Sequence, residues 1–152
     1  MRTWIVIAAL ALGGCKSNEV KSTQNGLTWK PPRGVSLVEE APGVLRFSDG
    51  VEVHSVSGEA PAIDESQLDA LLLAVLPRAH VEPLEKRISA RGGSIPAGAV
   101  ARWVLAGGGN RALHYYLPLK GRFLLISLTA PEDSFGTKES QLDLSLSSLK
   151  IE

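Results

Sequence analysis

The sequence predicts an α+β fold in which an antiparallel sheet packs against helices. Short segments that are rich in β-branched residues, or that alternate apolar and polar residues, recur from residue 35 onward. One segment between them instead has its leucines at helical spacing. With 152 residues, of which 44% are hydrophobic, the chain can bury one core without disulfides. We therefore expect a single α+β domain over residues 35–152, with about six to seven strands.

Three strands are expected before the helix, and they cover residues 35–40, 44–48 and 51–56. Each is short and consists of β-branched or alternating residues. Ser48-Asp49-Gly50 joins the last two segments, and an Asp-Gly pair is typical of a tight hairpin. The three strands are therefore expected to form an antiparallel meander.

A helix is expected over residues 64–76. Apolar residues recur there with the spacing of one helix face, at Leu68, Leu71, Leu72 and Val75. Asp64 is a typical N-cap residue, and Gln67 follows it at the distance of a capping box. Pro77 fits the end of the helix.

A second block of strands is expected over residues 83–90, 99–106, 111–119 and 122–130. Glycine-rich segments separate the first three strands, and Lys120-Gly121 is short enough for a tight hairpin before the last. Residues 123–127 have the sequence FLLIS, which is apolar enough for a strand that is buried on both faces. This strand is expected to lie at the centre of the sheet.

The C-terminal segment fits two patterns. Leu142, Leu146 and Leu149 share one face of a helix, yet Leu142, Leu144 and Leu146 also alternate as in a strand. Periodicity alone leaves both alternatives open.

The N-terminus has the pattern of an export signal. Arg2 supplies a positive charge, and residues 4–12 form an uninterrupted apolar run that is followed by small residues. A run of this length is too short for a membrane-spanning helix, which needs about 20 apolar residues. We expect residues 1–14 to be a signal peptide.

The single cysteine of the chain follows this apolar run after two glycines. Leu12-Gly13-Gly14-Cys15 resembles the lipobox of bacterial lipoproteins. The resemblance implies diacylglycerol on the Cys15 thiol, cleavage between Gly14 and Cys15, and acylation of the new amine. Two or three acyl chains would anchor the protein stably to a membrane. Lys16, in place of the Asp of inner-membrane lipoproteins, favours the outer membrane and its periplasmic side.

Residues 15–34 are expected to form the lipidated cysteine and a flexible tether. The segment is rich in Ser, Asn and Thr and ends in Pro31-Pro32, as linkers often do. Trp29 is the exception. It fits either a ring at the membrane interface or a cap on the first strand of the domain, and we favour the cap because the proline pair follows.

The order of elements resembles that of small bacterial lipoproteins with Mog1/PsbP-like domains. The resemblance covers Trp29 to the C-terminus and rests on a meander, one amphipathic helix, the strands of residues 114–135 and the closing segment 140–151. It implies an antiparallel sheet between helices, with a C-terminal helix over about residues 134–149 whose Phe135 and leucines pack on the sheet. Proteins of this fold group are mostly non-enzymatic accessory and assembly factors.

The three histidines do not predict a metal or catalytic site. His54, His80 and His114 are 26 and 34 residues apart, and none has a second ligand at the i+2 or i+4 spacing of a metal site. We interpret each as a surface or strand histidine. We expect no bound metal and no cofactor apart from the covalent lipid on Cys15.

Two glycine-containing segments also lack the rest of a catalytic motif. The run from Gly107 to Asn110 is followed by a strand, not by the helix and Lys-Ser/Thr of a phosphate-binding loop. Pro96 replaces the second glycine of a G-x-S-x-G frame around Ser94. No catalytic residues are predicted, and we expect the protein not to be an enzyme.

Two classes of function remain open. The chain has 16 basic and 16 acidic residues, and this balance argues against nucleic-acid binding. The first class is a membrane-anchored module that docks on, or helps to assemble, other envelope proteins. The second is a binder of a small envelope ligand, such as a lipid or a peptidoglycan fragment. Trp103, Tyr115 and Tyr116 are the candidate patch for either, exposed in the first case and lining a pocket in the second.

Overall fold

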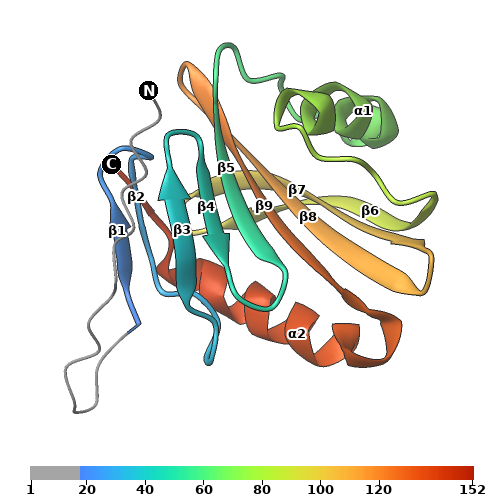
Figure 1. Cartoon of the computed structure of the whole chain (residues 1–152). Coiled ribbons are helices and arrows are strands. Elements are labelled where there is room, and N and C mark those ends of the chain that lie inside the picture. The colour runs from blue at the N-terminus through green and yellow to red at the C-terminus, as the bar shows by residue number, and fades with distance from the viewer. Residues whose placement is uncertain (1–17) are drawn as a thin grey trace.

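The computed structural model describes residues 18–152, which form a seven-stranded antiparallel sheet between two helices, with a smaller three-stranded sheet beside it (Figure 1). The strands of the large sheet are β3 (Leu37–Ala41), β4 (Val44–Phe47), β5 (Val51–Ser57), β6 (Lys86–Ile95), β7 (Gly98–Gly107), β8 (Asn110–Leu119) and β9 (Arg122–Pro131). Their spatial order is β3-β4-β5-β9-β8-β7-β6. The predicted α+β class and the strand number are confirmed.

Strand β9 is the central strand, as the apolar FLLIS segment predicted. Its side chains alternate between the two faces of the sheet. Leu124 and Ile126 belong to the core on one face, whereas Phe123 and Leu125 belong to the core on the other. Two separate cores therefore sandwich the sheet, one under each helix.

The predicted hairpin turns form, with one difference. Asp49 and Gly50 both have positive φ in the turn between β4 and β5, and Gly121 has positive φ between β8 and β9. Gly92 and Gly93 were expected to separate two strands, but they continue β6 and pair with Ala101 and Val100. The backbone pairing with β7 compensates for the low strand propensity of glycine.

Helix α1 (Leu68–Arg78) follows a short 3-10 turn, Glu65–Gln67, and covers one face of the sheet. The Asp64 side chain accepts a hydrogen bond from the Ser66 backbone N–H, so Asp64 caps the 3-10 turn. Gln67 makes no side-chain cap, and the predicted capping box is wrong. Pro77 lies inside the last turn of the helix rather than after it. Proline has no backbone N–H, and the hydrogen bond lost here would have gone to the carbonyl of Leu73, which is exposed to solvent.

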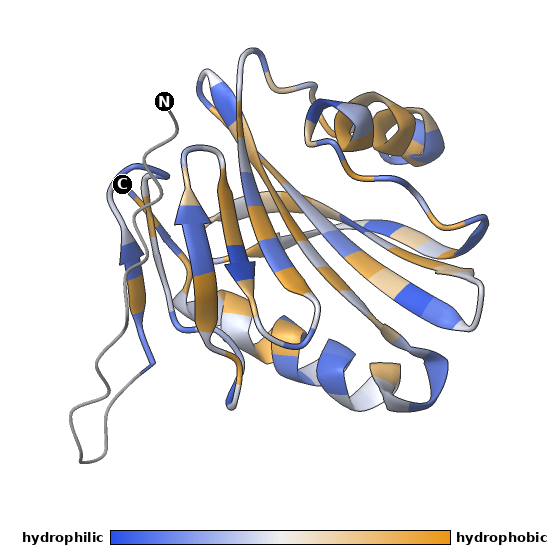
Figure 2. Ribbon diagram, in the orientation of Figure 1, coloured by the Kyte–Doolittle hydropathy of each residue, from blue (hydrophilic) through white to orange (hydrophobic). Residues whose placement is uncertain are grey.

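Helix α2 (Glu132–Ser145) starts directly after β9 and covers the opposite face. A 3-10 turn, Leu146–Ser148, and a short strand, β10 (Lys150–Ile151), end the chain. The helix implied by the family resemblance is therefore confirmed, and a strand at residues 142–146 is wrong. Figure 2 shows why the pattern was ambiguous, because α2 is largely polar and carries only a few hydrophobic residues, whereas α1 is mostly hydrophobic.

The segment expected to be a flexible tether is folded from Asn18 onward. Strands β1 (Val20–Ser22) and β2 (Leu27–Trp29) pair with each other and β2 pairs with β10 in the small sheet. Leu27 and Trp29 are fully buried in the core under α2, and Trp29 stacks edge-on against Phe47. Trp29 is thus part of the core and not a ring at a membrane interface.

Buried hydrogen bonds explain why this folded segment has a polar sequence. The Ser22 hydroxyl donates to Glu40 Oε1 at 2.6 Å, and Asn25 Nδ2 donates to Ser22 Oγ and to the carbonyl of Ala41. Buried polar groups are tolerated when every donor and acceptor has a partner.

None of the helices in residues 18–152 has the length and hydropathy needed to cross a membrane.

Candidate functional site

The predicted lipidation and cleavage residues, Cys15 and Gly14, lie outside the described residues. The described chain starts at Asn18, whose side chain donates hydrogen bonds to the carbonyls of Pro31 and Pro32 at 3.0 and 3.4 Å. The first described residue is therefore attached to the body of the domain.

The predicted aromatic patch does not form. Trp103 and Tyr116 are fully buried under α1, while Tyr115 is 6% exposed and lies in the core under α2. Tyr115 and Tyr116 are neighbours in β8, and successive side chains of a strand point to opposite faces of a sheet. The three rings therefore hold the two helices onto the sheet and are not a surface for a partner.

The site that the structure offers instead is a cleft between the β4–β5 hairpin and the C-terminal end of α1. It has a volume of about 510 Å³ and is lined by four basic side chains and one carboxylate, namely Arg46, Glu52, His54, Arg78 and His80. His54 and His80 are 26 residues apart in sequence. A strand and a helix end thus bring together two histidines whose spacing gave no signal.

Most of the charged groups in the cleft already have partners. Glu52 Oε2 lies 2.9 Å from His54 Nε2, and Glu52 Oε1 lies 3.7 Å from Arg46 Nε. Arg78 donates to the carbonyls of Glu59 and Ser57 at 2.7 and 3.2 Å. The hydrogen bonds of Arg78 and the contact of Glu52 with His54 restrain these side chains, which reduces the loss of conformational entropy when a polar partner binds.

The β4–β5 hairpin carried a weak signal for part of this site. Glu52 and His54 are two positions apart, so they share one face of a strand. Arg46 pairs with Glu52 across the hairpin. A cluster of these three residues could have been inferred from the predicted hairpin and its register, whereas the approach of Arg78 and His80 could not.

His80 ends helix α1 with a strained backbone. Its φ is +57°, and its N–H donates to the carbonyl of Pro77 while the N–H of Val81 donates to that of Leu76. This is the Schellman arrangement, in which the residue at the position of His80 is usually glycine. A histidine that keeps this conformation on the rim of a cleft is a candidate for function.

His114 lies on the face of the sheet that α1 covers, as the cleft does, and is 2% exposed. Its Nδ1 is 2.6 Å from Ser127 Oγ, and its Nε2 has no hydrogen-bond partner among the described residues. Burial, together with the smaller effect of the nearby His54, lowers the pKa of His114 to about 4. A serine–histidine pair of this kind is a poor catalyst at neutral pH, because a general base works best when its pKa is near the working pH.

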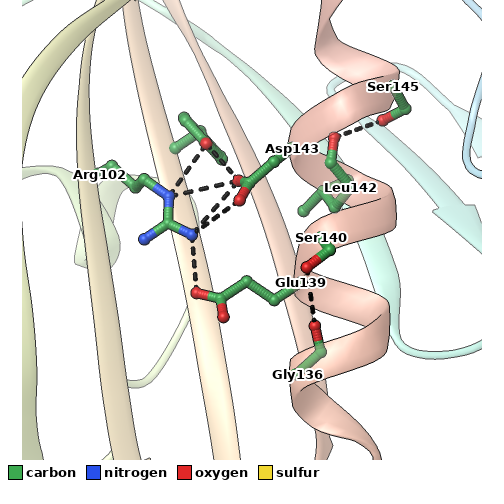
Figure 3. A network of polar contacts seen from close by, with 8 residues as sticks. Arg102, Gly136, Glu139, Ser140, Leu142, Asp143 and Ser145 are labelled. Carbon is green, nitrogen blue, oxygen red and sulfur yellow. Dashed lines mark hydrogen bonds and ion pairs between the residues drawn. The ribbon is translucent and has the colours of Figure 1, made fainter.

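A second polar cluster joins α2 to the sheet. Arg102 Nη2 donates to Glu139 Oε2 at 2.7 Å and to Asp143 Oδ2 at 3.1 Å (Figure 3). The Tyr115 hydroxyl also donates to Asp143. Burial alone would lower the pKa of Arg102, but the hydrogen bonds that Arg102 donates to Glu139 and Asp143 raise it above its ordinary value. Burial, together with the hydrogen bond to Asp143, raises the pKa of Tyr115 to about 12.

The Arg102 cluster is best explained as a structural clamp. The guanidinium spans two successive turns of α2, so Glu139 and Asp143 both hold the helix against β7. A groove of about 270 Å³ opens beside Arg102, but Arg102 and Tyr115 already donate hydrogen bonds to side chains of α2. No group of three or more His, Cys, Asp or Glu residues suited to a metal ion occurs in residues 18–152.

Comparison with known proteins identifies the fold. No protein family model and no curated protein sequence matches the chain. The solution structure of cyanobacterial PsbP (CyanoP) from Synechocystis sp. PCC 6803 is similar over 93% of this chain and 98% of the other, with a TM-score of 0.60 and 16% identity. A crystal structure from Bacteroides thetaiotaomicron VPI-5482 is similar over 88% of this chain and 48% of the other, with a TM-score of 0.54 and 13% identity. The chain therefore has a PsbP-like α+β fold.

Proposed function

We propose that the protein is a lipid-anchored docking module of the bacterial cell envelope, without catalytic activity. The anchor would be the lipid on Cys15 that the lipobox pattern implies, and the membrane would be the outer membrane on its periplasmic side. The docking site would be the cleft of Arg46, Glu52, His54, Arg78 and His80. The observation that carries the proposal is this cleft, because Glu52 and Arg78 line a surface hollow while held by an ion pair and by hydrogen bonds.

The anchor is tested with the variant Cys15→Ser. We expect the parent protein to incorporate a labelled fatty acid and to fractionate with the outer membrane, because two or three acyl chains hold a protein stably. The variant should carry no label and should leave the membrane fraction. Equal labelling of the two proteins would contradict the lipobox interpretation.

The docking role is tested by photocrosslinking in cells. A photoreactive residue in place of Val44, which lines the cleft, should give a discrete adduct of higher mass. The matched control replaces Val38, which is 64% exposed and does not line the cleft. The adduct should disappear when Arg46→Glu is added to a protein that remains folded. An adduct that survives Arg46→Glu, or one that forms equally from position 38, would contradict docking at the cleft.

Binding of a small ligand is the second candidate. Leu72, Val75 and Leu76 of α1 pack against aromatic side chains of the sheet, so no room remains there for a lipid. The cleft has the volume of a small-molecule site, and its two arginines and two histidines suit a carboxylate-bearing fragment of peptidoglycan better than an acyl chain. Titration with such a fragment should shift the NMR signals of His54 and His80 and leave those of buried His114 unchanged.

A further inference from the structure

We propose that a groove at the C-terminal end of α2 rests on an anionic phospholipid surface and holds the domain in one orientation on the membrane. This groove, called the anchor-side groove below, has a volume of about 300 Å³ and lies between residues 30–33 and residues 141–148. The inference rests on the lipid anchor of the proposed function and adds a second, non-covalent contact with the membrane.

The anchor-side groove lies beside the first described residue, Asn18. Asn18 Nδ2 donates to the carbonyls of Pro31, Pro32 and Val35, so the first described residue is fixed at the wall of the groove. Cys15 precedes Asn18 by three residues, which span about 10 Å at full extension. A lipid on Cys15 would therefore keep the groove close to the headgroups.

The two walls of the groove form one rigid unit. The backbone N–H of Lys30 donates to Ser148 Oγ at 3.1 Å, and the indole N–H of Trp29 donates to the carbonyl of Ser145 at 3.1 Å. Segments that are more than 100 residues apart in sequence are joined by these bonds. The surface is therefore preformed and needs no ordering to bind.

The exposed side chains of the groove suit a membrane interface. Leu144 is 76% exposed, the largest value for any large hydrophobic side chain among residues 18–152. Lys30 and Arg33 are exposed, and neither forms an ion pair with a described residue. No carboxylate lines the groove. A leucine flanked by cations can enter the headgroup region while the cations bind anionic lipids.

The anchor favours the membrane over other occupants of the groove. An anchored domain meets the lipid surface at a high effective concentration, so two basic residues and one leucine suffice for a contact that would be weak in solution. A protein partner has no comparable advantage at this place. The contact should weaken in high salt, because exposed charges are screened.

A fluorescent label at Leu144 tests the proposal with the full-length lipidated protein. The thiol of Cys15 is the only cysteine of the chain and would be blocked by its thioether, so Leu144→Cys would supply the single reactive thiol. The matched control is Leu73→Cys, which is 66% exposed and lies on α1 across the sheet. The proteins are placed in vesicles that contain anionic phospholipid and a lipid with a nitroxide near the headgroup.

We expect the nitroxide to quench the label at position 144 at least about threefold more strongly than the label at position 73. Lys30→Glu together with Arg33→Glu should reduce the quenching at position 144 to the level found in zwitterionic vesicles. Equal quenching at the two positions in a lipidated protein would overturn the groove contact and leave the anchor intact. A change at position 144 that depends on protein concentration without vesicles would overturn it in favour of a second copy. A chain that carries no fatty acid would contradict the proposed function itself.

Discussion

The environment of His114 makes stability depend on pH. The histidine is neutral in the folded protein down to a pKa of about 4, whereas its ordinary pKa is 6.5. Between these values the unfolded chain binds a proton that the folded chain does not, so stability falls as the pH falls. From pH 7 to pH 5 the free energy of unfolding should decrease by about 2 kcal/mol through this residue.

Urea unfolding at pH 7 and pH 5 measures this effect. The control is His114→Gln, which keeps a polar group beside Ser127 but cannot be protonated. The variant should have a smaller decrease between the two pH values, because few carboxylates titrate in this range. An identical decrease in both proteins would show that His114 is not the cause of the pH dependence.

His80 offers the opposite case, a residue whose replacement should stabilise the protein. Its positive φ is unfavourable for a residue with a Cβ and favourable for glycine. His80→Gly should therefore raise the free energy of unfolding by about 1 kcal/mol. His80→Ala is the control and should give no gain, since alanine has the same backbone strain. A loss of stability in the glycine variant would mean that the imidazole itself stabilises the helix end.

The two histidines show what a single sequence can reveal about individual residues. The strand position of His114 was predicted, but its burial depends on Trp103 and Ser127 of neighbouring strands. The role of His80 depends on the end of helix α1, which runs through Pro77 and stops at Arg78. In both cases the decisive contacts are distant in sequence, so no local spacing could indicate them.

At the scale of elements, the Arg102 cluster decides how α2 is held on the sheet. Arg102→Met would leave Glu139 and Asp143 facing a buried surface without a positive charge. The loss of one partner of such a cluster should cost about 3 kcal/mol of stability at pH 7.

Arg111→Met is the matched control for the cluster. Arg111 pairs with Glu132 at the start of the same helix, but the Glu132 side chain is 60% exposed. An exposed pair of this kind contributes at most about 1 kcal/mol. Similar losses in the Arg102 and Arg111 variants, measured by urea unfolding, would contradict the clamp.

The elements that the sequence predicted best are those with a complete local pattern. Seven strands and helix α1 have their own periodicity and turn residues, and each is found close to its expected residues, except that β6 continues to Ile95 through glycines that were expected to form a turn. Helix α2 has only two buried residues, Phe135 and Leu142, so its periodicity was weak and the family resemblance was needed. Strands β1 and β2 have three residues each, and β2 pairs with β10 at the other end of the chain.

At the scale of the whole molecule, the sheet separates two surfaces with different proposed roles. The cleft lies on the face of α1, and the anchor-side groove lies at the end of α2 on the opposite face. A domain that rests on the membrane through the groove would present the cleft away from the lipid. This arrangement would leave the cleft accessible to soluble parts of other envelope proteins.

The same arrangement depends on an N-terminal segment that is part of the fold. Removal of residues 1–34 would delete Leu27 and Trp29 from the core and leave β10 without its partner strand. Loss of the buried tryptophan alone should cost about 3 to 5 kcal/mol, a large share of the stability of a domain of this size. Removal of residues 1–17 should leave the free energy of unfolding unchanged, because no deleted residue belongs to β1 or β2. Urea unfolding of the two truncated proteins compares them directly. Equal stability would show that the segment from Asn18 to Gly34 is the flexible tether that its composition suggested, and the lipid would then no longer hold the groove at the membrane.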